Sequence, residues 1–130
     1  MHIVTWNCGG SFRTKYQMIK DLNPDICIIE ECEDIELFKN QKKFSDFVSF
    51  HSNFIKTGER KHLAIFAKEG ITLEKIKANY KMPKTNSYLE CFLPVLVNQK
   101  YLFVGVWTKE VSKEKQGHKV FRYIGQFYFF

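Results

Sequence analysis

The sequence has few cysteines and no long hydrophobic run, and each absence excludes a class of protein. The four cysteines lie at positions 8, 27, 32 and 91 and form no Cys-x-x-Cys pair, which argues against a disulfide framework or a structural zinc site. No apolar stretch is long enough to span a membrane, and Met1 opens directly into a predicted strand without a signal-peptide core. We therefore expect a cytoplasmic protein.

Length and charge narrow the interpretation further. The 130 residues suffice for one domain, which we assign to residues 1–130. The net charge of +6 is uneven: residues 1–49 hold six Lys or Arg against eight Asp or Glu (−2), and residues 50–130 hold fourteen against six (+8). A basic half suits a partner that carries phosphate, such as nucleic acid, although lysines that only solvate strand edges and loops would give the same count.

The first part of the chain predicts a strand, a helix and a second strand. Residues 2–7 are apolar and β-branched, apolar side chains at helical spacing follow over 12–22, and 26–29 is a continuous apolar run. The crossover through a helix makes the two strands parallel. Asn7 and Glu31 then leave the sheet at the same edge, where open α/β sheets usually bind ligands.

The remaining chain predicts further strands and two more helices. We expect helices over 35–44 and 117–130, a polar loop over 53–61, and strands over 47–51, 63–67, 71–76, 88–97 and 101–107. The turn at 68–70 is expected to join one hairpin and the turn at 98–100 a second. These elements predict an α/β fold of mixed α+β type, with one mixed β-sheet that carries helices on one face.

Two motifs in the first strands resemble those of the endonuclease/exonuclease/phosphatase superfamily. The first motif of that superfamily ends in Trp-Asn, as Trp6 and Asn7 do here. The second reads Pro-Asp-Ile, followed by apolar residues and a Gln-Glu pair, and residues 24–31 follow this order except at the Gln. The resemblance covers most of this chain but only the first half of the superfamily's domain. It implies half of a four-layer α/β sandwich.

The resemblance also implies a metal site and a reaction. In the superfamily the Glu of the second motif is the principal metal ligand, and the Asn of the first motif helps to orient the metal and the phosphate. By resemblance these roles fall to Glu31 and Asn7, with Mg²⁺ or Mn²⁺ as the cofactor and a phosphoester as the substrate. The chemistry fits, because Mg²⁺ prefers hard oxygen ligands and usually takes only one or two carboxylates from a protein.

The sequence departs from the superfamily pattern in several places. Glu30 stands where Gln is frequent, His62 where Gly is common, and Trp107 where many members have His or Tyr. The Gly-Asp-x-Asn and Ser-Asp-His motifs, which in the superfamily provide catalytic groups and the phosphate contact, have no counterpart in the sequence. The resemblance therefore implies the N-terminal portion of a Mg²⁺-dependent phosphodiesterase or nuclease, a truncated domain that is inactive or weakly active alone.

Other interpretations of these residues stay open. A non-catalytic phosphate- or nucleic-acid-binding module would use the same basic half, and a truncated gene product would have no function of its own. Cys8 and Cys32 each follow a site residue and could contribute to a zinc site. A sheet with one uncovered apolar face predicts that the chain forms a homodimer or binds a complementary C-terminal half.

Overall fold

The computed structural model of the chain describes residues 1–51, 53–57, 61–77 and 92–107. Its helices are α1 (Phe12–Lys15), α2 (Gln17–Leu22) and α3 (Lys42–Phe50), with a 3₁₀ turn at Ile35–Leu37. Its strands are β1 (Ile3–Asn7), β2 (Ile26–Glu33), β3 (Asn53–Lys56), β4 (Lys61–Ala67), β5 (Leu73–Lys75), β6 (Phe92–Val97) and β7 (Tyr101–Val106). The α+β class predicted from the sequence is confirmed.

The first sheet has the strand order β1-β2-β4-β3. β1 and β2 run parallel, as the sequence predicts, and β4 runs antiparallel to both β2 and β3. The apolar run at the start of β2 suits this internal position, because its side chains are buried on both faces of the sheet. Cys27 and Ile29 belong to one core, whereas Ile26 and Ile28 belong to the other.

The chain forms a second sheet, where the sequence predicted only one. This sheet is antiparallel with the order β5-β6-β7, and β6 and β7 form the predicted hairpin around residues 98–100. The prediction of a hairpin around residues 68–70 is wrong, because β5 pairs with β6 rather than with β4. Instead, the turn at Gly70 (φ 84°) leads the chain to the second sheet, where Thr72 N donates to Asn98 Oδ1 at 2.9 Å.

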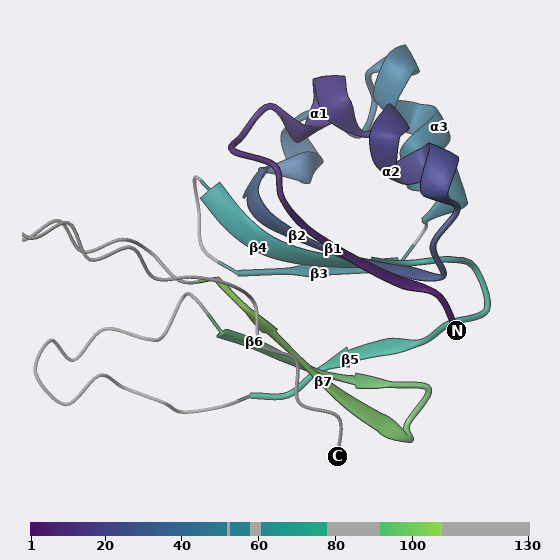
Figure 1. The fold of residues 1–130 in the computed structure, drawn as a ribbon, viewed down its shortest axis with the longest axis vertical. Helices are drawn as coiled ribbons and strands as arrows, with labels where there is room; N and C mark the ends of the chain where they lie inside the picture. The colour runs from purple at the N-terminus through teal and green to yellow at the C-terminus, as the bar shows by residue number, and fades with distance from the viewer. Residues whose placement is uncertain (52, 58–60, 78–91, 108–130) are drawn as a thin grey trace, which may run out of the picture.

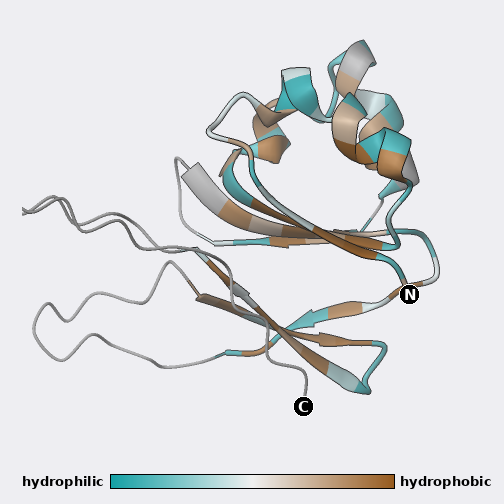
Figure 2. Cartoon of the chain, in the orientation of Figure 1, coloured by the Kyte–Doolittle hydropathy of each residue, from teal (hydrophilic) through white to brown (hydrophobic). Residues whose placement is uncertain are grey.

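The elements stack in three layers (Figure 1). Helices α1, α2 and α3 cover one face of the first sheet, and the second sheet covers the other face. The helix-side core centres on Phe12, whose ring lies 6.0, 5.2 and 5.6 Å from the rings of Phe44, Phe47 and Phe66. In Figure 2, hydrophobic colour covers much of the strands of both sheets.

A helix replaces the strand that was predicted over 47–51. α3 buries Phe44 and Phe47, which lie three residues apart and therefore on one helical face. His51, four residues beyond Phe47, follows the helix and stacks on Phe47 with ring centroids 4.8 Å apart. The Phe-Val pair at this point favours a strand by local propensity, but burial of the helical face in the aromatic core overrides that preference.

Other predicted boundaries also differ from the structure. The predicted loop over 53–61 contains β3, the predicted helix over 12–22 is divided into α1 and α2, and the helix predicted over 35–44 is a 3₁₀ turn followed by the start of α3. The predicted helix over 117–130 and the first part of the strand predicted over 88–97 lie outside the described residues.

The second sheet has an apolar outer face, on the side away from the first sheet. Its inner face packs between the sheets, with Leu93, Val95 and Val97 fully buried. Alternate residues of β6 and β7 form the outer face, and within it the Phe92 side chain is 42% exposed while the others are partly exposed. The outer face consists of Phe92, Pro94, Leu96, Leu102, Val104 and Val106.

Candidate functional site

Asn7 and Glu31 lie side by side, as the parallel connectivity predicts, but Glu31 does not leave the sheet there, because β2 continues to Glu33. Asn7 is the last residue of β1 and pairs with Glu30 of the parallel strand β2. The side-chain nitrogen of Asn7 lies 3.4 Å from Glu31 Oε1 and 3.5 Å from Glu30 Oε2. An amide and two carboxylates therefore meet at one edge of the sheet, where two neighbouring parallel strands carry them.

An irregularity in β2 brings both carboxylates to this point. The pairing of β2 with β4 shifts register between Ile29 and Cys32, and Glu31 adopts the left-handed backbone conformation with φ 54°. Successive side chains of a regular strand point to opposite faces, whereas a bulge can re-aim one of them. Glu30 and Glu31 thus reach the same amide. A non-glycine residue in this conformation costs about 1–2 kcal/mol, a form of strain that clusters at functional sites.

The loop after β1 fixes the orientation of the Asn7 amide. Asn7 Oδ1 accepts a hydrogen bond from Gly9 N at 3.0 Å, so the amide nitrogen is the atom that faces the carboxylates. In this arrangement Asn7 orients Glu30 and Glu31, and its own oxygen would face a cation only after rotation of the amide. Asn7 is exposed and the two glutamates are half-buried, so their polar groups are accessible from solvent.

The charge of Glu31 acts on the Glu30 carboxyl. Partial burial raises the pKa of the Glu30 carboxyl, the hydrogen bond from Asn7 opposes this rise, and the neighbouring charge of Glu31 adds to it. A divalent cation between the two carboxylates would relieve their repulsion. The oxygen-only donors fit Mg²⁺ or Mn²⁺. Within the described ranges no group of three His, Cys, Asp or Glu side chains is placed to hold a metal, so an ion here would keep several water ligands, as Mg²⁺ commonly does.

The other acidic residues predicted beside the metal position are held in ion pairs. Glu33 bonds with the guanidinium of Arg13, whose Cζ lies 4.2 Å from the ring centre of Phe38. Asp34 pairs with Lys56 of β3. Glu36 pairs with Lys39 at 2.6 Å on the surface. Within the acidic segment of 30–36, Glu30 and Glu31 are the carboxylates that contact Asn7.

The cysteines near the site are buried thiols. Cys8 Sγ donates to the backbone oxygen of Glu31 at 3.4 Å, and Cys27 and Cys32 are fully buried. Burial raises the pKa of all three thiols, which keeps them protonated near neutral pH and makes them poor metal ligands. The zinc alternative gains no support from the part of the chain that the structure describes.

The tryptophans singled out by the motifs are core residues. Trp6 packs edge-on against Phe12 with ring centroids 6.4 Å apart. Trp107 is buried in the core between the sheets. The side chain of His62 and all of His118 lie outside the described residues. His51, which carried no predicted role, is fully buried at the C-terminal end of α3.

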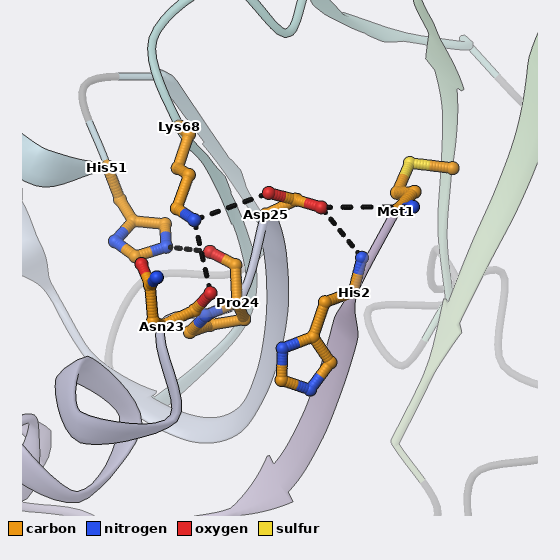
Figure 3. A network of polar contacts seen from close by, with 7 residues as sticks. All are labelled: Met1, His2, Asn23, Pro24, Asp25, His51 and Lys68. Atoms are coloured by element: carbon orange, nitrogen blue, oxygen red, sulfur yellow. Dashed lines mark hydrogen bonds and ion pairs between the residues drawn. The ribbon is translucent and has the colours of Figure 1, made fainter.

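Asp25 of the Pro-Asp-Ile motif has a structural role at the opposite end of the strands (Figure 3). Its Oδ2 accepts the backbone N–H of His2 at 2.7 Å, and its Oδ1 lies 3.3 Å from Lys68 Nζ. These two contacts, the His2 N–H first, hold the pKa of the Asp25 carboxyl below its ordinary range. Beside them, His51 Nε2 lies 3.1 Å from the Pro24 backbone oxygen. The network joins the ends of β1, β2 and β4 away from Asn7 and Glu31.

Sequence reasoning missed Glu30 as a site residue and noted it only as a departure from Gln. Glu30 could have been found from the register of the parallel strands, because this register places it opposite Asn7. The left-handed backbone of Glu31 could not have been found in this way, because no glycine in the sequence indicates it.

Comparison with known proteins identifies no relative of this chain: no family model, curated protein or solved structure matches it. The site is therefore interpreted from its own residues. In the described part of the chain, no helix has the length and apolar character needed to cross a membrane.

Proposed function

We propose that this chain carries the metal-binding corner of a Mg²⁺-dependent phosphodiesterase of the nuclease type, in which Mn²⁺ can replace Mg²⁺. One observation carries the proposal: the side-chain nitrogen of Asn7, at the end of β1, lies within 3.5 Å of the carboxylates of Glu30 and Glu31, in the second half of β2. The resemblance of Trp6-Asn7 and of residues 24–31 to the superfamily motifs supports a phosphoester substrate. The basic excess of residues 50–130 favours nucleic acid among such substrates.

Each site residue has a defined part in this proposal. Glu31, with Glu30 beside it, would hold the cation through carboxylate oxygens, and Asn7 keeps both carboxylates in place through its amide nitrogen. When bound, Mg²⁺ neutralises charge on a non-bridging phosphate oxygen and makes an attacking water more acidic. The next carboxylates along the chain, Glu33 at the end of β2 and Asp34 after it, are in ion pairs. The described residues thus provide metal binding without a separate general base, so weak turnover is expected.

Metal binding by the full chain is the direct test. Isothermal titration with Mn²⁺ should give one site in the wild type, and Glu31→Gln should weaken it by roughly tenfold or more, because it removes a charged ligand while keeping the side-chain shape. Glu36→Gln is the matched control, since it makes the same change on the exposed surface five residues away. Equal Mn²⁺ affinity in the wild type and Glu31→Gln would remove Glu31 as a ligand.

Turnover separates the proposed enzyme from the alternative of a non-catalytic module. Hydrolysis of bis-p-nitrophenyl phosphate and of DNA or RNA is measured with Mg²⁺, with EDTA, and with Glu31→Gln. The phosphodiesterase proposal expects slow Mg²⁺-dependent hydrolysis that Glu31→Gln abolishes. Nucleic-acid binding that weakens steeply with salt, without turnover and without a metal requirement, would instead establish a phosphate- or nucleic-acid-binding module.

The outer face of the second sheet supports a further part of the proposal, a homodimer or a complementary chain that covers it. Six apolar side chains stand on this face, with Phe92 42% exposed. Light scattering during size-exclusion chromatography should show a mass above 15.5 kDa for the isolated chain if a second copy covers the face. Phe92→Glu should return that species to the monomer mass. A wild-type monomer at high concentration would leave the complementary chain as the occupant.

We also propose that the protein acts in the cytoplasm. Cys8, Cys27 and Cys32 are free buried thiols, which suits a reducing compartment. Fractionation of cells that express a tagged chain tests this location.

A further inference from the structure

Lys15 of α1 reaches back to the loop that follows β1. Its ammonium donates to two backbone oxygens of this loop, Cys8 O at 2.6 Å and Gly10 O at 3.0 Å. Lys15 is half-buried, and the helix from which it extends is fixed by Phe12, which is buried in the aromatic core. The Lys15 ammonium therefore links two backbone oxygens of the loop to a helix that is anchored in the core.

The residue between these two oxygens is Gly9, which contacts the site directly. Gly9 N donates to Asn7 Oδ1 at 3.0 Å, and the other end of the same amide faces Glu30 and Glu31. Gly9, Gly10 and Ser11 all have positive φ, at 62°, 83° and 57°. Such a backbone is not held by regular secondary structure, so contacts that cross the loop define its shape.

We propose that Lys15 is a positioning residue for the candidate metal site, acting through Gly9 and Asn7. By holding Cys8 O and Gly10 O, Lys15 keeps the Gly9 N–H aimed at Asn7 Oδ1, and this contact keeps the Asn7 nitrogen on the carboxylates. The role of Lys15 in metal binding rests on the proposed function, whereas its effect on the orientation of Gly9 and Asn7 does not. Supporting groups of this kind typically change metal affinity by 10–100-fold.

The first measurement needs no metal. In Lys15→Met, the Gly9 amide proton should exchange with solvent several-fold faster than in the wild type, and the Asn7 side-chain NH₂ resonances should shift. Lys20→Met in α2 is the matched control, because it removes the same charge from the neighbouring helix. A second variant, Lys15→Gln, keeps two N–H donors on a shorter side chain and replaces Lys15→Met if that variant does not fold. Unchanged Gly9 exchange and Asn7 resonances in a folded Lys15 variant would overturn the positioning role.

The second measurement is a double-mutant cycle with Mn²⁺ as the probe. Lys15→Met should weaken Mn²⁺ binding roughly tenfold in the wild-type background, with little further loss in Asn7→Ala, because the effect of Lys15 passes through Asn7. Additive losses would overturn that route, and tighter Mn²⁺ binding in Lys15→Met would overturn it as well, because it would show that the Lys15 charge mainly repels the cation. If the wild type binds no Mn²⁺, the proposed function fails, and Gly9 exchange still decides whether Lys15 positions Asn7.

Discussion

At the scale of single residues, Glu31 combines a proposed role in metal binding with backbone strain. Its left-handed conformation, φ 54°, is one that glycine adopts without steric cost, yet a carboxylate stands there. The same conformation turns that carboxylate toward Asn7, beside Glu30. The two carboxylates therefore reach Asn7 together only with this strained backbone. A regular backbone at Glu31 should separate them.

Two substitutions at Glu31 separate strain from charge. Glu31→Gly and Glu31→Ala both delete the carboxylate, but only alanine retains the Cβ that opposes a positive φ. We expect the free energy of unfolding of Glu31→Gly to exceed that of Glu31→Ala by about 1 kcal/mol, as measured by urea denaturation. Both variants should have lost Mn²⁺ binding. A more stable alanine variant would show that the backbone at this position is not strained.

Residue identities predicted part of this site. Asn7 and Glu31 were placed together by reasoning from connectivity, because a helical crossover forces parallel strands whose ends share an edge. Glu30 and Lys15 were not predicted as site residues. Their contacts depend on a bulge in β2 and on a loop with three successive positive φ values, and neither Glu31 nor Ser11 reveals such a backbone by residue type.

At the scale of elements, the network around Asp25 joins the starts of β1 and β2 to the end of β4. Asp25 N donates to His2 O at 2.8 Å, Lys68 N donates to Asp25 O at 3.0 Å, and the Asp25 carboxylate binds His2 N–H and Lys68. His51, at the end of α3, adds the helix layer through its contact with the Pro24 oxygen. These contacts join the starts of β1 and β2, the end of β4 and the end of α3, at the end of the strands opposite Asn7.

Burial of His51 makes stability depend on pH. Burial and the nearby Lys68 charge lower the pKa of His51 below its ordinary value of about 6.5, although the Pro24 oxygen and Asp25 oppose the shift. Above about pH 6.5 the ring is neutral in both folded and unfolded chains. Below it, the unfolded chain binds the proton first, so stability is lost as the pH falls from 6.5 toward the lowered value, by at most about 1.4 kcal/mol per pH unit.

The variant His51→Phe tests this pH dependence. Phenylalanine keeps the stacking on Phe47 but cannot titrate, so urea unfolding at pH 7.5 and pH 5.0 should differ less in the variant than in the wild type. Loss of the contact with Pro24 should lower stability at pH 7.5 by about 1 kcal/mol. Titration of Asp25 does not contribute to this difference. Its pKa is lowered from 3.8, so the stability that its carboxylate provides is lost only below pH 5.0. Equal pH dependence in the two proteins would contradict the assignment.

Elements with a simple pattern were predicted well, and those that depend on tertiary contacts were not. The apolar run at 26–29 predicted a buried strand, and the turn at 98–100 predicted the β6–β7 hairpin. α3 was missed because Phe47 and Val48 have strand propensity, while its helical burial pattern depends on the aromatic core. β5 was assigned to the wrong partner because Gly70 marks a turn without specifying which sheet follows it.

At the scale of the whole molecule, the stacking of the two sheets depends on a small residue. Gly105 of β7 faces the first sheet, and a Cβ placed there would lie 3.2 Å from Leu63 Cδ2 and 3.4 Å from Ile28 Cγ2. Both contacts are with side chains across the interface between the sheets, in the core that the sequence did not predict. Glycine thus allows β7 to approach β2 and β4 closely.

Enlarging this residue should destabilise the interface between the sheets. We expect Gly105→Val to lower the free energy of unfolding by roughly 1–3 kcal/mol, through overpacking against Leu63 and Ile28, with a smaller effect for Gly105→Ala. Circular dichroism with urea provides the measurement. Adding Leu63→Ala to Gly105→Val should cost less than the sum of the two single changes, because each compensates the other in volume. Additive costs would show that the two side chains do not meet.

The edge position of β1 has a consequence for the site itself. Among the described strands only β2 pairs with β1, and alternate peptide groups of residues 3–7 point to the outer side of this edge strand. Asn7 is the last residue of this edge strand. A segment of another chain that paired with β1 as an additional strand would therefore lie beside Asn7 and bring its own side chains to the candidate metal site.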